Sequence, residues 1–134
     1  MDGYLILGYP YVAMTQRMSL ADVRPVSRLF KALGDETRLR IVGLLAHREL
    51  CVCHLQEALG VSQPTVSRHL GILRSAGVVE SRRDGSWIHY GLAHQDDPEC
   101  ERQLRAVARS FARDQALRRD IDRLLKSRGP GACR

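Results

Sequence analysis

The residues of this sequence best suited to carry chemistry are two cysteines one residue apart, Cys51 and Cys53. Two further cysteines, Cys100 and Cys133, lie in the last third of the 134 residues. This usage does not fit a small secreted protein built on disulfides, and Asp2 stands where an export signal would be basic. We therefore expect a cytoplasmic protein with reduced thiols. A reduced pair at this spacing indicates metal binding or redox chemistry.

The pair lies at the start of a short helix predicted over residues 50–59. The N-terminus of a helix lowers the pKa of a thiol, so we expect one or both sulfurs to be thiolates at neutral pH. Thiolates prefer soft ions, such as trivalent arsenic or lead, over hard cations. On a regular helix, side chains two residues apart point roughly 200° apart, so we expect an ion bound by both sulfurs to distort the first turn. The alternative is two half-buried cysteines that act only as small apolar residues.

A small, mainly helical domain is expected to position this pair. Apolar residues at helical spacing predict helices over residues 22–33, 35–45, 50–59, 65–76 and 98–126, the last as one helix or two. Residues 78–90 change to a strand pattern around Asp84-Gly85, which predicts a β-hairpin. The expected organisation is an N-terminal arm over 1–21, flexible or upstream of a true start at Met14 or Met18, a domain over 22–126, and a flexible tail over 127–134.

The last helical region carries an apolar stripe with members about four residues apart. Its members are Leu104, Val107, Phe111, Leu117, Ile121, Leu124 and Leu125. The stripe exceeds what one small core requires, so we predict that it forms a dimer surface with the first helix. The alternative is a helix folded onto its own domain. In the helix over 65–76, the residues expected to face the core are Val66, Leu70, Ile72 and Leu73.

The two helices on either side of residues 60–62 predict a helix-turn-helix, and the net charge of +6 favours a polyanionic partner. The start of the second helix offers short polar side chains and donors for base edges and phosphates. The hairpin that follows is expected to act as a wing over the DNA backbone. The predicted DNA-contacting residues are Ser62, Gln63, Thr65, Ser67, Arg68 and His69 on the helix, and Arg82 and Arg83 on the wing.

Three stretches of this sequence resemble the ArsR/SmtB metalloregulators, in particular the arsenic-responsive branch. They are residues 30–41 (FKALGDETRLRI), 49–55 (ELCVCHL) and 62–70 (SQPTVSRHL), and the similarity extends through the hairpin to Tyr90. It covers about residues 24–93. The resemblance implies a homodimeric winged helix-turn-helix repressor that needs no cofactor to bind double-stranded operator DNA and that leaves the DNA when an inducer binds.

The resemblance also implies an inducer, trivalent arsenic or antimony, held by Cys51 and Cys53. The arsenic-sensing pattern has a further cysteine where this chain has Gln56. A third sulfur would then come from Cys100 or Cys133, in the same subunit or the other. If two sulfurs suffice, a trivalent organoarsenical with two exchangeable positions fits the site.

Other readings of the thiol pair are weaker. Cadmium- and lead-sensing relatives carry cysteines in the N-terminal arm, and none precedes Cys51 here. Zinc-sensing relatives use histidine on the final helix, and residues 98–134 contain none. His54 is expected to be a capping or solvated side chain. A thiol redox sensor would need a disulfide partner such as Cys100. An enzyme is not expected, since we find no phosphate loop, Cys-x-x-Cys or catalytic triad.

Overall fold

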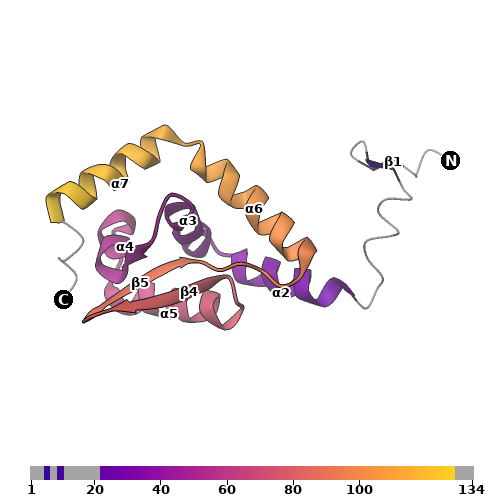
Figure 1. Ribbon diagram of the computed structural model, residues 1–134, viewed down its shortest axis with the longest axis horizontal. Helices are drawn as coiled ribbons and strands as arrows, with labels where there is room; N and C mark the ends of the chain where they lie inside the picture. The colour runs from indigo at the N-terminus through magenta and orange to yellow at the C-terminus, as the bar shows by residue number, and fades with distance from the viewer. Residues whose placement is uncertain (1–4, 7–8, 11–21, 129–134) are drawn as a thin grey trace.

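The computed structural model describes residues 5–6, 9–10 and 22–128 (Figure 1). The elements are, in chain order, β1 (Leu5–Ile6), β2 (Tyr9–Pro10), α2 (Val23–Leu33), α3 (Glu36–Leu45), β3 (Leu50–Cys51), α4 (Val52–Leu59), α5 (Gln63–Ser75), β4 (Val79–Asp84), β5 (Trp87–Leu92), α6 (Pro98–Ala112) and α7 (Gln115–Arg128). Most of the predicted arm over 1–21 lies outside the described residues. Among the described residues, no helix is long and apolar enough to cross a membrane.

The arrangement is that of a winged helix-turn-helix, as predicted. Helices α4 and α5 pack together and are joined at Gly60, whose φ of 68° is a left-handed conformation that glycine adopts at little cost. The antiparallel hairpin of β4 and β5 follows α5 and turns at Gly85, which has a φ of 63°. Figure 1 shows α6 and α7 as an arch on the other side of the domain from α5 and the hairpin.

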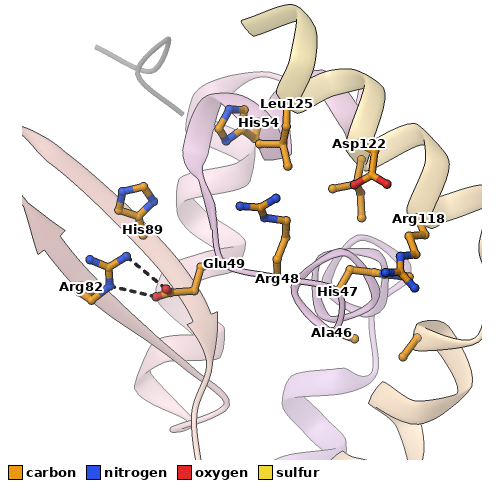
Figure 2. Close-up of a pocket in the computed structure, with 12 residues that line it drawn as sticks. Ala46, His47, Arg48, Glu49, His54, Arg82, His89, Arg118, Asp122 and Leu125 are labelled. Atoms are coloured by element: carbon orange, nitrogen blue, oxygen red, sulfur yellow. Dashed lines mark hydrogen bonds and ion pairs between the residues drawn. The ribbon is translucent and has the colours of Figure 1, made fainter. Parts of the chain in front are cut away.

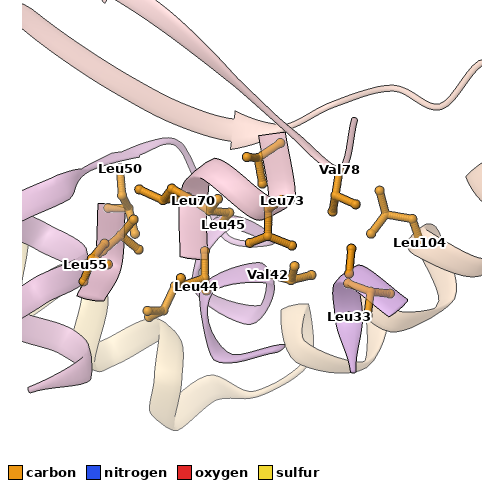
Figure 3. Close-up of a cluster of buried hydrophobic side chains, with 14 of the residues drawn as sticks. Leu33, Val42, Leu44, Leu45, Leu50, Leu55, Leu70, Leu73, Val78 and Leu104 are labelled. Carbon is orange, nitrogen blue, oxygen red and sulfur yellow. The ribbon is translucent and has the colours of Figure 1, made fainter. Parts of the chain in front are cut away.

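One apolar core joins all of these layers (Figure 3). Val42 of α3, Leu55 of α4 and Leu73 of α5 are fully buried, as is Val78 just before β4. Leu104 of α6 closes the core on the arch side. The position and facing of the two helix-turn-helix helices are therefore set by apolar packing against α3 and against each other.

The expectation of one helix over residues 50–59 is wrong at its start. Leu50 and Cys51 form strand β3, which pairs with β5 so that Leu50 lies opposite Tyr90 and Cys51 opposite His89. The sheet therefore has three strands in the order β3-β5-β4. The helix begins only at Val52, with Cys51 as its N-cap in an extended conformation.

The apolar stripe of the last third lies mainly against its own domain, which was the alternative reading. Leu104 and Ile121 are buried within the chain, and Phe111 packs on Gly43 of α3. Helix α7 packs on α4 and continues to Arg128, so residues 127–128, expected in the tail, are helical. The remainder of that tail lies outside the described residues.

Two apolar expectations also differ in detail. Ile72, predicted to face the core, is 42% exposed, because it lies off the face of α5 that buries Val66, Leu70 and Leu73. Phe30 of α2, which shares the helical spacing of the first helix, is 50% exposed. Large apolar side chains therefore remain on the outside of α2 and α5 in the single chain.

Two glycine-to-alanine substitutions are predicted to change stability in opposite directions. A Cβ at Gly43 would lie 2.9 Å from the base of the Phe111 ring, whereas a Cβ at Gly71 of α5 would meet no atom within 4 Å. Gly43→Ala should lower the free energy of unfolding by about 1–2 kcal/mol, since overpacking outweighs the gain in helix propensity. Gly71→Ala should raise it by about 0.5–1 kcal/mol. Urea denaturation followed by circular dichroism measures both, and equal effects would contradict the Phe111 contact.

Candidate DNA-binding surface and thiol site

The first turn of α5 presents a group of exposed polar side chains. Gln63 and Ser67 are exposed and joined by a bond of 2.8 Å from Gln63 Nε2 to Ser67 Oγ. The hydroxyl oxygens of Ser62, the N-cap, and Thr65 lie 2.9 Å apart. Arg68 is exposed on the next turn. Five of the six helix residues expected to contact DNA thus lie on one end of α5, where short polar groups and free backbone N–H groups suit phosphates and base edges.

His69, the sixth, does not lie on this surface, and the expectation that it is exposed is wrong. It is 7% exposed, and its Nδ1 lies 3.3 Å from an Arg38 guanidinium nitrogen and 3.8 Å from Asp35 Oδ2. Arg38 also donates through Nε to the carbonyl oxygen of Ala32. His69 therefore ties the recognition helix to the junction of α2 and α3. Its spacing of three residues from Val66 and four from Leu73 could have identified it as a core-face residue.

The wing arginines differ in their surroundings. Arg82 donates from Nε and an Nη to the two carboxylate oxygens of Glu49, each at 3.2 Å. This pairing lowers the pKa of Glu49 and raises that of Arg82. Arg83 is exposed on β4. Arg83 therefore faces solvent at the wing, while Arg82 is held at its base by a residue that sequence reasoning missed.

The two sulfurs of the candidate ligand pair lie close together. Cys51 is the N-cap of α4, with φ −91° and ψ 170°, and Cys53 lies in the first turn. Their Sγ atoms are 3.8 Å apart, a non-bonded contact since a disulfide is about 2.05 Å long. One ion at about 2.3 Å from each sulfur can reach both only if the sulfurs lie within about 4.6 Å of each other, and this pair does. The expectation that the two side chains point apart, as on a regular helix, is therefore wrong.

His54 supports this geometry from inside the domain. It is 2% exposed, and its Nδ1 lies 3.0 Å from Cys51 Sγ. The backbone N–H of Cys51 also points at His54 Nδ1 at 3.5 Å, and the Cys51 sulfur accepts from the backbone N–H of His54. This reciprocal cap confirms the capping role expected of His54 and shows that the side chain is buried instead of solvated.

The sulfur pair opens onto a pocket of about 240 Å³ that reaches the DNA-binding elements. Its lining residues are Cys51, Val52, Cys53, Gln56, Gln63, Ser86 and Ile88. The walls thus include the first residue of the recognition helix and two residues of the wing. Ser86 and Ile88 carry no local signal that could have identified them, because their place depends on the pairing of β5 with β3. In the described part of the chain, no group of three or more His, Cys, Asp or Glu residues is arranged to hold a metal ion.

The two remaining cysteines are in different positions. Cys100 is 4% exposed in the first turn of α6, which packs against α2 at the end of the molecule away from α4 (Figure 1). Burial, followed by the nearby Asp97 carboxylate, raises the pKa of the Cys100 thiol. The structure does not bring Cys100 together with Cys51 and Cys53 in one chain. Cys133 lies outside the described residues.

Similarity to known proteins agrees with this geometry. Residues 35–81 match the family described as "Bacterial regulatory protein, arsR family". The arsenical resistance operon repressor of Escherichia coli (strain K12) is 45% identical over 98 residues, which are 64% of this chain and 84% of that protein.

Two solved structures share the fold. The transcriptional repressor BigR from Xylella fastidiosa superposes with a TM-score of 0.59 at 32% identity, over 75% of this chain and 92% of that chain. A homodimeric winged helix-turn-helix DNA-binding domain from Mycobacterium bovis gives a TM-score of 0.53 at 31% identity, over 86% of this chain and 92% of that chain. The chain therefore belongs to the arsR family of bacterial regulatory proteins and is a DNA-binding regulator of transcription.

Proposed function

We propose that this protein is a cytoplasmic repressor that binds operator DNA as a homodimer and is released when trivalent arsenic or antimony binds Cys51 and Cys53. The observation that carries the proposal is the 3.8 Å separation of the two sulfurs in a pocket shared with Gln63. The similarity to the Escherichia coli arsenical resistance operon repressor supports the choice of ion. DNA binding itself needs no cofactor in this proposal.

Release follows from the shared walls of the pocket. An ion held by both sulfurs occupies space between the first turn of α4, Gln63 of the recognition helix and Ile88 of the wing. Gln63 is bonded to Ser67, so a displacement of Gln63 disturbs the polar surface of the first turn of α5. The inducer thus acts on two DNA-binding elements by direct contact, and helix α4 stays wound.

A third ligand is better supplied by Cys133 than by Cys100. Cys100 is buried in the core beside α2, and using it would require α6 to leave the domain. Leu125 of α7 lines the same pocket as His54, whose ring contacts Cys51 Sγ. Cys133 lies five residues beyond Arg128, the last residue of α7, and therefore stays the candidate for a third ligand. With only two sulfurs, the site takes a trivalent organoarsenical, whose organic group would occupy the pocket.

The dimer proposal rests on the outer face of α2 and on family membership. Val23 and Phe30 are 40% and 50% exposed there, and a homodimeric domain is among the structures that share the fold. The redox-sensing and the cadmium- or lead-responsive alternatives use the same sulfur pair. They differ in which reagent releases the DNA.

Substitution of either cysteine of the pair is predicted to separate DNA binding from induction. Cys51→Ser and Cys53→Ser should bind the operator within about threefold of the unaltered protein, because the core packing around a sulfur-to-oxygen change is largely kept, and should not be released by arsenite. The measurement is fluorescence anisotropy of labelled operator titrated with arsenite, antimonite, cadmium, lead and peroxide. Release by peroxide alone would favour the redox alternative, and normal arsenite release of the double variant would end the proposal.

The two candidate third ligands are predicted to behave differently. Cys100→Ser should leave the arsenite midpoint for operator release unchanged, whereas Cys133→Ser should raise it if three sulfurs bind the ion. The raised pKa and burial of Cys100 also predict that iodoacetamide modifies it only after denaturation, as measured by mass spectrometry of the intact and digested protein. Rapid native alkylation of Cys100 would contradict its placement.

The helix and the wing are predicted to contribute in different ways to DNA binding. Arg83→Gln should weaken binding about equally for specific and random DNA and reduce the slope of log K against log salt by about 1, since it removes one phosphate contact. Gln63→Ala should weaken the free energy of binding to the operator by about 1–3 kcal/mol and leave binding to random DNA unchanged. Arg119→Gln, an exposed arginine of α7, is the matched control. A sequence-specific loss at Arg83 would contradict the wing assignment.

A further inference from the structure

A second pocket, on the other side of His54, is lined mainly by residues that play no part in the proposed DNA or inducer binding. It has a volume of about 570 Å³ and lies between the segment before β3, the β-sheet and α7 (Figure 2). Its walls include arginines from three parts of the chain, Arg48, Arg82 and Arg118. Pockets of about 300–1,000 Å³ are the usual size for small-molecule ligands.

The charges in this pocket are only partly balanced. Arg82 is neutralised by its two bonds to Glu49. Figure 2 shows Arg48 extending between that pair on the sheet side and Asp122 and Arg118 on α7. Neither Arg48 nor Arg118 forms an ion pair with a side chain of residues 22–126. Two guanidinium groups without a counter-charge of their own thus line a space that holds one further carboxylate, that of Asp122.

We propose that this pocket binds a phosphate-class oxyanion, free or as the phosphoryl group of a small molecule, through Arg48 and Arg118. A guanidinium presents a planar fork of N–H donors that matches the oxygens of such an anion. Arg48 and Arg118 line the same pocket from different elements, and its volume leaves room for an organic remainder beside the anion. An isolated cation would instead meet an excess of positive charge.

The pocket is also in contact with both functional parts of the protein. His54 lies in its wall and touches Cys51 Sγ, and Arg82 is one of the two wing arginines. An anion bound there therefore lies next to the support of the thiol pair and the base of the wing. The proposal does not depend on the identity of the inducer, and its test needs neither DNA nor arsenic.

The test is calorimetric titration of the full chain with inorganic phosphate and phenyl phosphate, in a buffer whose ionic strength is held constant with chloride. We expect saturable binding at millimolar or lower concentration, weakened about tenfold or more in Arg118→Gln and in Arg48→Gln by loss of a charge-assisted contact. Tighter binding of phenyl phosphate than of inorganic phosphate would assign the site to a phosphorylated molecule, and the reverse to the free ion.

Arg119→Gln is the control, because it removes the same charge from the next residue of α7 without altering the pocket lining. It should bind as the unaltered protein does. Phosphate should also raise the Tm of the unaltered protein and of Arg119→Gln but not of Arg118→Gln, since a ligand stabilises only the state that binds it. Absence of saturable binding, or equal weakening in Arg118→Gln and Arg119→Gln, would overturn the proposal.

Discussion

The pairing of two residues, Leu50 and Cys51, with strand β5 is the constraint on which the functional part of this molecule depends. It holds Cys51 in an extended conformation, so that the residue ends a strand and caps a helix at once. A helical Cys51 would turn its sulfur away from that of Cys53. Because β5 is also the central strand of the sheet, the same strand positions the thiol pair and the wing.

A consequence is that the wing is held mainly by the strand ladder and the core, and only weakly by its ion pair. The Arg82–Glu49 pair joins side chains that are each about half exposed, and such pairs contribute about 0–1 kcal/mol. The pairs of backbone bonds along β4 and β5 and the burial of Val79 contribute more in sum. Arg82 can therefore exchange its carboxylate for a DNA phosphate or another anion at small cost while the wing keeps its shape.

The sequence was informative where local chemistry decides the structure. Residues 60–62 predict the turn before α5, and Asp84-Gly85 predicts the hairpin. It was uninformative about β3, since a two-residue strand has no periodicity and its partner lies almost forty residues further along the chain. The prediction that His69 contacts DNA is wrong because it rests on polarity alone, whereas the spacing of His69 from Val66 and Leu73 places it on the buried face.

The same distinction bears on how two subunits would meet. The large number of apolar residues in α6 and α7 predicts a dimer surface, but two of them, Leu104 and Ile121, complete the core of their own chain. Side chains already buried in their own chain have no surface left to bury in a dimer interface. A dimer must therefore use the apolar side chains that the single chain leaves exposed, and on α2 these are Val23 and Phe30. Recognition helix α5 packs on α2 and is tied to the end of α2 through His69 and Arg38. A dimer formed across α2 would therefore fix the spacing of its two recognition helices through this polar contact as well as through the core.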